Sequence, residues 1–445
     1  MNTHQPIDTL IHASWILTQN PQRQVLRDFS LAITEGKISA ILPRADAQQR
    51  TAKTHIDLPG HALMPGLINM HGHAAMTLFR GLADDLPLNT WLKQHIWPAE
   101  NALLDPEFVS CGTSLAIAEM LRSGTTCYAD HYLFPEASID PIQHSGIRAH
   151  LFCPIIDVKT NWSAHAQAGI DSAIALQQQV ANHPKINIGL GPHAPYTVSD
   201  ESLKRVRDTA QKHQLFIQIH LHETEQEVAQ SQAQYGMRPI ARLQQLGILG
   251  PQLQCVHMVA LNDDDLNQVA AAGAGVVHCP ESNLKLASGF CPVQQILEHD
   301  IPLALGTDGA ASNNDLDLIS EMRTAALIAK ATAQDAEALS AQQVFDCATL
   351  SGARMLGQAH RLGSLEVGKE ADVVALDWRS IELQPIYNPI SQLVYATQRE
   401  QVVQVWIGGQ RVLQDRQPCG IHLDTLKQNI LHYQQSVQRV IQGAS

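Results

Sequence analysis

The sequence predicts a (β/α)8 TIM-like barrel with a small β-sandwich domain formed from both chain ends. Short apolar runs alternate with longer helix-like segments through the middle of the chain, as they do in parallel βα units. Strand-like segments separated by turns occupy both ends. The expected ranges are 1–58 and 361–423 for the two parts of the β-sandwich, 59–360 for the barrel and 424–445 for a C-terminal helix.

The two chain ends share an alternation of apolar and polar residues that is typical of strands. Turn signals such as Glu35-Gly36 and Gly408-Gly409 interrupt this alternation. Because the two β-rich ends flank a central region with a different pattern, they indicate one small domain assembled from both chain ends. The predicted strand segments are Asp8–Thr18, Phe29–Leu42, Ala371–Asp377 and Val402–Ile407. The predicted C-terminal helix has an apolar stripe of Leu426, Ile430, Val437 and Ile441.

Eight apolar runs in the middle of the chain match the strand count of a (β/α)8 barrel. They are Leu63–His73, Thr125–Tyr132, Ile147–Ile156, Ile186–Ala194, Leu215–Glu223, Leu253–Met258, Gly275–Pro280 and Pro302–Gly309. Polar groups gathered at the C-terminal strand ends are what a barrel active site requires. For any single one of these residues, the alternative interpretation is a buried polar side chain whose hydrogen bonds are satisfied within the protein. These strand-end residues are His71, His73, Asp130, His131, His193, His220, Glu223, His257, His278 and Asp308.

Composition restricts the partners and the compartment. The 445 residues carry 30 Lys+Arg and 43 Asp+Glu, a formal net charge of −13 at pH 7. This charge argues against DNA, RNA or an anionic membrane as the main partner. The cysteines form no CxxC pair, no signal peptide is indicated, and no apolar run of about 18 residues occurs. We therefore expect a cytoplasmic protein without a membrane span.

Three motifs at strand ends carry groups that bind metal ions. His71 and His73 end the first apolar run, and residues two apart in a strand point to the same side, so both imidazoles can meet one ion. His220 and His222 form a second pair on one face, and both need not be ligands. Asp308 ends the eighth run. Three histidines and an aspartate would leave the open position that catalytic zinc keeps for water.

Longer motifs around these residues resemble the amidohydrolase superfamily of metal-dependent hydrolases over nearly the whole chain. Within it the sequence resembles the methylthioadenosine/S-adenosylhomocysteine deaminases, which neighbour the guanine deaminases and the triazine hydrolases. The motifs are MPGLINMHGH at Met64–His73, GPHAPYT at Gly191–Thr197, HLHET at His220–Thr224, HCPESNLKL at His278–Leu286, LGTDGAASNN at Leu305–Asn314 and GSLEVGKEADVV at Gly363–Val374.

The resemblance implies one divalent metal ion, with zinc as the expected metal. Bound water would have its pKa lowered toward ~7. Asp308 would accept the proton of that water, His257 would orient it, and Glu223 would deliver a proton to the heterocycle. The implied metal ligands are His71, His73, His220 and Asp308, and the implied catalytic residues are Glu223, His257 and Asp308.

The same resemblance separates supporting residues from ligands. His222 is expected to be a core or supporting histidine, because the family ligand stands three residues before the catalytic glutamate. His278 is expected to have a structural hydrogen-bonding role, with direct substrate contact as the alternative. Two-metal members use a modified lysine at the end of strand four, where His193 stands here, and Lys185 precedes that strand at its opposite end. One metal ion is therefore expected.

The implied substrate is an adenosine-type nucleoside, which would be converted to its inosine analogue and ammonia. Glu100 matches a family glutamate that holds the ribose hydroxyls, and His193 matches a histidine that contacts the nucleoside; Glu223 and Asp308 would contact it too. Some relatives carry an arginine in strand three, where this chain has His150–Pro154. This difference favours methylthioadenosine over S-adenosylhomocysteine. Expected apolar walls, with core packing as the alternative, are Leu82, Trp91 and Trp97.

Two other functions stay open at this point. One is a hydrolase of the same fold that acts on another aminated or halogenated heterocycle, such as guanine or a triazine. The other is a non-catalytic binding paralogue, although such proteins usually have broken metal sites. A homo-oligomer is a possible assembly, and the sequence does not fix the oligomeric state.

Overall fold

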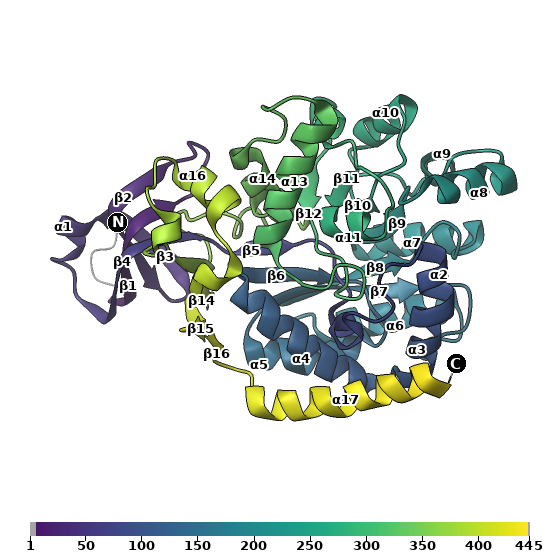
Figure 1. Ribbon diagram of the computed structural model, residues 1–445, viewed down its shortest axis with the longest axis horizontal. Coiled ribbons are helices and arrows are strands. Elements are labelled where there is room, and N and C mark those ends of the chain that lie inside the picture. The colour runs from purple at the N-terminus through teal and green to yellow at the C-terminus, as the bar shows by residue number, and fades with distance from the viewer. Residues whose placement is uncertain (1–5, 444–445) are drawn as a thin grey trace.

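The computed structural model describes residues 6–443, which form a barrel with a smaller β domain at one end (Figure 1). Two separate eight-stranded sheets lie within these residues, one in each part. The predicted fold class, a (β/α)8 barrel with a β domain built from both chain ends, is confirmed. Residues 1–5 and 444–445, which the expected domain ranges include, lie outside the described part of the chain.

The smaller sheet joins the two chain ends in the strand order β16-β15-β14-β13-β4-β1-β2-β3. Strand β4 makes the junction, because it pairs in parallel with β1 and antiparallel with β13. Apolar side chains from both halves, including Leu31 and Trp406, form a common core. The strands are β1 Ile7–Leu17, β2 Val25–Thr34, β3 Lys37–Pro43, β4 Ala52–Pro65, β13 Val373–Asp377, β14 Val402–Ile407, β15 Gln410–Gln414 and β16 Gln417–Pro418.

The first predicted barrel strand, Leu63–His73, is divided between the two sheets, so a continuous strand is wrong here. Strand β4 continues in the β domain to Pro65, and the barrel strand β5 covers only Leu67–Asn69. Gly66 lies at the change of sheet, where a Cβ atom would come within 2.0 Å of Thr126 Oγ1. Residue 58, the expected end of the first β-sandwich part, lies inside β4.

The larger sheet contains the barrel strands in chain order from β5 to β12, with parallel pairing between neighbours. The ring closes where the backbone N–H of Met70 donates to the carbonyl oxygen of Leu305 at 2.9 Å. All strand C-termini therefore open on one face. The strands are β5 Leu67–Asn69, β6 Thr125–Asp130, β7 Arg148–Ile155, β8 Ile186–Pro192, β9 Ile217–Leu221, β10 Leu253–His257, β11 Gly275–His278 and β12 Leu303–Leu305.

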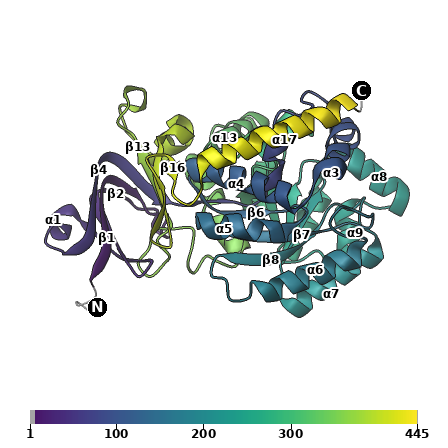
Figure 2. The same cartoon turned by 90° about the horizontal axis from the view of Figure 1, so that it is seen from below.

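Helices surround the barrel (Figures 1 and 2). The principal ones are α4 Pro106–Arg122, α5 Ile139–Ser145, α6 Ala166–Gln179, α7 Asp200–His213, α8 Glu225–Tyr235, α9 Pro239–Gln245, α10 Asp263–Ala272, α11 Pro280–Lys285, α12 Val293–Glu298, α13 Leu318–Ala333, α14 Ala341–Cys347 and α15 Leu350–Met355. Further helical segments between β5 and α4 are η1 Ala74–Phe79, α2 Leu88–Trp91, η2 Leu92–Ile96 and α3 Trp97–Leu103. In the β domain, α1 is Arg44–Ala47 and α16 is Pro389–Ser391.

The C-terminal helix α17 (Leu423–Gly443) lies along α4 and reaches α3, as Figures 1 and 2 show. The Tyr433 ring packs against Phe108 with 5.1 Å between ring centroids. Leu426 and Val437 are buried, whereas Ile441 of the predicted stripe is exposed. The helix is thus attached to the barrel. Within residues 6–443, no helix combines the length and the hydropathy needed to cross a membrane.

Candidate metal centre and active site

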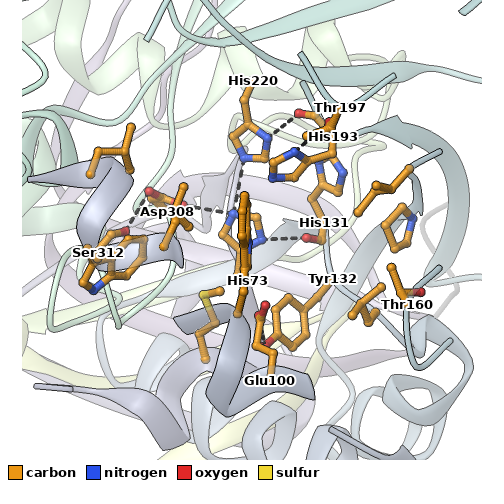
Figure 3. A pocket seen from close by; sticks show the side chains of 18 of the residues that line it. His73, Glu100, His131, Tyr132, Thr160, His193, Thr197, His220, Asp308 and Ser312 are labelled. Atoms are coloured by element: carbon orange, nitrogen blue, oxygen red, sulfur yellow. Dashed lines mark hydrogen bonds and ion pairs between the residues drawn. The ribbon is translucent and has the colours of Figure 1, made fainter. Parts of the chain in front are cut away.

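Three imidazoles and one carboxylate converge at the C-terminal face of the barrel. Figure 3 shows His73, His220 and Asp308 of this group. His71 and His73 follow β5, His220 lies in β9, and Asp308 follows β12. Nε2 of His220 lies 3.2 Å from Nε2 of His71 and 3.3 Å from Nε2 of His73. Asp308 Oδ1 lies 3.4 and 3.1 Å from the same two nitrogens. The tertiary structure thus brings the four predicted ligands together.

The outer nitrogen of each imidazole faces a hydrogen-bond acceptor. Nδ1 of His73 lies 2.6 Å from the carbonyl oxygen of His131, and Nδ1 of His220 lies 2.6 Å from that of His193. Nδ1 of His71 lies 2.7 Å from a side-chain oxygen, Oε1 of Gln218. Because a carbonyl oxygen only accepts, each Nδ1 carries the hydrogen. In the neutral rings each Nε2 then has a free lone pair directed into the site.

These residues fit a divalent metal ion. Burial lowers the pKa of His71 to about 4 and that of His220 well below its usual value, which favours neutral rings. The neutral Nε2 lone pairs of His71 and His220, which face one another at 3.2 Å, repel without a cation between them. The pKa of His73 is raised despite its burial, because its Nε2 lies against the Asp308 carboxylate. Imidazole nitrogen with carboxylate oxygen is a donor set that zinc and similar ions accept.

The second oxygen of Asp308 is held by two hydroxyl groups. Ser282 and Ser312 donate hydrogen bonds to its Oδ2 at 2.6 and 2.7 Å. The backbone of Asp308 has a φ of 61°, in the left-handed region that non-glycine residues rarely adopt. The turn after β12 therefore aims Oδ1 at the histidines and leaves Oδ2 with the serines.

Glu223 and His257 lie beside the converging donors. Nδ1 of His257 lies 2.9 Å from Asn283 Oδ1, and its Nε2 lies 3.9 Å from Glu223 Oε2. Ser288 donates to the other oxygen of Glu223 at 3.3 Å. Burial raises the pKa of Glu223, so the carboxyl group holds a proton more readily than an exposed glutamate. Such a group is suited to general acid catalysis.

A cavity of about 270 Å³ opens in front of these donors. Trp91 and Trp97 line it, as predicted, whereas Leu82 packs against the apolar cluster that contains Trp91. His193 and Glu100 also line it, and burial raises the pKa of Glu100 to about 7. In Figure 3, Glu100 and Asp308 lie on different sides of His73. The cavity therefore presents Glu100 and Asp308 at separate positions, and the Trp91 and Trp97 side chains add apolar surface to its wall.

The comparisons with known proteins agree with this geometry. The Amidohydrolase family matches residues 62–412, from the end of β4 through the barrel to β15. The chain belongs to the amidohydrolase family. Two proteins named 5-methylthioadenosine/S-adenosylhomocysteine deaminase, from Saccharophagus degradans and Teredinibacter turnerae, are 48% and 46% identical to this amidohydrolase over 418 and 417 residues. Each alignment covers 94% of both chains.

A solved structure is also similar to this amidohydrolase. The crystal structure of an adenosine deaminase from Xanthomonas campestris with bound zinc is 47% identical and superposes with a TM-score of 0.96. The match covers 98% of this chain and 99% of the other. Both parts of the molecule therefore have counterparts in that protein.

Two histidines of the sequence motifs lie apart from the converging donors of this amidohydrolase. His222 has a φ of 53°, and its Nδ1 lies 2.8 Å from the carbonyl oxygen of Ala260 while its Nε2 accepts from the backbone N–H of Ile240. The expectation that it shares one face with His220 is wrong, because β9 ends at Leu221 and the alternation stops there. His278 is buried in β11, and burial lowers its pKa to about 3.

Several polar residues of the amidohydrolase site were not predicted. Gln218 orients a histidine from within β9, and Ser282, Asn283 and Ser312 hold Asp308 and His257. Tyr132 donates to Glu100. Three of them stand inside the motifs HCPESNLKL and LGTDGAASNN, so motif membership was the available signal. The partner of each one depends on the tertiary fold.

Proposed function

We propose that this amidohydrolase is a metal-dependent deaminase of adenosine-type nucleosides. Its substrates would be 5′-methylthioadenosine, S-adenosylhomocysteine or adenosine, and its products the inosine analogue and ammonia. The observation that carries the proposal is the convergence of three imidazole Nε2 atoms with Asp308, beside the buried Glu223 in one cavity. The names of the relatives at 46–48% identity support the same reaction.

The proposed ligands of the metal are His71, His73, His220 and Asp308, and zinc is the proposed ion because the similar Xanthomonas campestris structure holds it. When bound, such an ion supplies a water molecule that is acidified enough to act as a nucleophile near neutral pH. The acceptors on each Nδ1 keep the rings oriented toward this ion.

Glu223 is the proposed proton donor to the heterocycle. Addition of water to C6 of adenine pushes electrons onto N1, which must then gain a proton. Glu223 is buried, burial raises its pKa above that of an exposed glutamate, and Ser288 restrains one of its oxygens. Protonation at N1 by a placed acid contributes roughly 10²–10⁴-fold to the rate.

Asp308 and His257 are the proposed partners of the attacking water. Asp308 would accept its proton and pass it to the leaving amino group, which departs as ammonia. Ser282 and Ser312 hold Asp308 while this happens. His257 presents Nε2 toward the same space because Asn283 fixes its Nδ1. The nucleophile would thus be oriented by one group and deprotonated by another.

Glu100 and His193 are the proposed contacts to the nucleoside. A carboxylate can accept from two adjacent hydroxyls, which suits a ribose diol. His193 lines the cavity with Nδ1 against Thr197 Oγ1 at 3.0 Å, and burial lowers its pKa to about 4, so the neutral ring contacts substrate. Trp91 and Trp97 supply apolar surface for the purine or the 5′ substituent.

A substrate panel at fixed zinc concentration tests the proposal. Ammonia release and the change in adenine absorbance are measured for methylthioadenosine, S-adenosylhomocysteine, adenosine, guanine and a chlorotriazine. We expect the adenosine-type nucleosides to turn over, with methylthioadenosine the best. Turnover of guanine or the triazine with inert nucleosides would refute the proposal. Zinc-free protein that stays inactive after reconstitution would support a non-catalytic role instead.

The compartment and the assembly are part of the proposal. All eight cysteines are free, and seven are buried. Unpaired thiols in this number are typical of a reducing compartment, so we place the enzyme in the cytoplasm. Its proposed partner is the small nucleoside, and sedimentation would establish the oligomeric state.

A further inference from the structure

We propose that Tyr132 is a positioning residue that sets the Glu100 carboxylate for the vicinal hydroxyls of ribose. The His131-Tyr132 dipeptide would then fix the distance between the metal-binding end and the ribose-binding end of the pocket. This inference rests on the proposed function, in which Glu100 binds the ribose.

The Tyr132 side chain connects the two ends directly. Its hydroxyl donates a hydrogen bond to Glu100 Oε1 at 2.6 Å (Figure 3). Its ring lies 6.0 Å from the imidazole of His73, measured between centroids. Tyr132 is only 6% exposed and lines the same cavity as Glu100. The phenol is therefore enclosed between a proposed metal ligand and the proposed ribose carboxylate.

The preceding residue anchors the dipeptide to the barrel. The carbonyl oxygen of His131 accepts from Nδ1 of His73 at 2.6 Å, and its backbone N–H donates to the carbonyl oxygen of Gly72 at 2.9 Å. Its ring Nε2 donates to the carbonyl oxygen of Gly191 in β8 at 2.9 Å. One residue thus orients His73 through its backbone, and the next orients Glu100 through its side chain. The planar peptide between them keeps this spacing constant.

The carboxylate needs such a partner to bind a diol well. The terminal torsion of glutamate is broad, so an unrestrained carboxylate rotates freely. The bond from Tyr132 occupies one acceptor site of Glu100 and fixes the carboxylate plane. The remaining acceptor sites then face the cavity in one orientation, which two adjacent hydroxyls can use together.

Tyr132→Phe tests the inference, because it removes only the phenolic hydroxyl. Steady-state kinetics would compare adenosine with 2′,3′-dideoxyadenosine, which lacks the diol. We expect KM for adenosine to rise about tenfold, the loss of one hydrogen bond to a charged group. We expect kcat to stay within about twofold and KM for the dideoxy substrate to stay unchanged, since only ground-state binding of the diol is affected.

A double-mutant cycle with Glu100→Gln separates positioning from a general structural role. If Tyr132 acts through Glu100, Tyr132→Phe has no further effect on adenosine KM in the Glu100→Gln background. Equal losses for both substrates, or additive effects of the two substitutions, would overturn the inference. Melting curves check that each variant is folded. A wild-type enzyme that releases no ammonia from either nucleoside would instead refute the proposed function, and the inference with it.

Discussion

The carbonyl oxygen of His193 lies 2.6 Å from Nδ1 of His220 and accepts its hydrogen bond. The ring of the same His193 lines the cavity. One residue directly after β8 therefore orients a proposed metal ligand with its backbone and faces the proposed substrate cavity with its side chain. Since a side-chain substitution leaves the carbonyl in place, the two roles can be separated by mutation.

Glu223→Gln should keep the metal and lose most of the rate. The amide has nearly the same shape as the carboxyl group, but it cannot deliver a proton to the heterocycle. We expect kcat to fall by at least about 10²-fold. Metal content by mass spectrometry should equal that of the wild type. Turnover like that of the wild type would remove Glu223 from the mechanism.

His220→Ala should lose bound metal, whereas the neighbouring His222→Ala should keep it. Nε2 of His220 faces His71 and His73, while His222 bonds to backbone groups elsewhere. Metal per chain, measured after dialysis, distinguishes the two variants. We expect His222→Ala to lower the free energy of unfolding by about 1–3 kcal/mol, because buried backbone groups lose their partner. Metal loss in both variants would contradict these assignments.

The KM for adenosine should rise as the pH falls below about 7, where burial places the pKa of Glu100. The carboxylate accepts from the ribose hydroxyls, and protonation on the acid side of its pKa removes that charge. We expect about a tenfold increase in KM between pH 8 and pH 6. The dideoxy substrate and the Glu100→Gln variant serve as controls and should lack this dependence. The same pH dependence of KM in either control would assign the titration to a group other than Glu100.

Gly66→Ala should destabilise the junction between the two sheets. The added Cβ would lie 2.0 Å from Thr126 Oγ1 and 2.3 Å from Thr126 Cγ2. Overpacking of this kind costs about 1–3 kcal/mol or more in the free energy of unfolding. Gly250→Ala is the matched control, because nothing lies within 4 Å of its Cβ position. Equal stability of the two variants in chemical denaturation would contradict the packing at the junction.

Much of the fold could be predicted because buried segments consist mainly of apolar residues, which are visible in the sequence. Barrel strands are enclosed on both faces, so they read as apolar runs that end where the chain reaches the open face. Val402–Ile407 was predicted with the bounds that β14 has. The division at Gly66 was not predicted, because an apolar run does not reveal that its two halves pair with different sheets.

The sequence by itself determined the barrel, the β domain built from both ends, and the motif residues that gather at the strand ends. Only the tertiary structure decided where each side chain of those motifs points. His220 and His222 are alike in sequence, yet a φ of 53° at His222 turns its ring toward Ala260 and away from the metal site. The partnership of Tyr132 with Glu100 joins segments 32 residues apart. Local pattern encodes burial and periodicity, whereas such contacts depend on how distant segments pack.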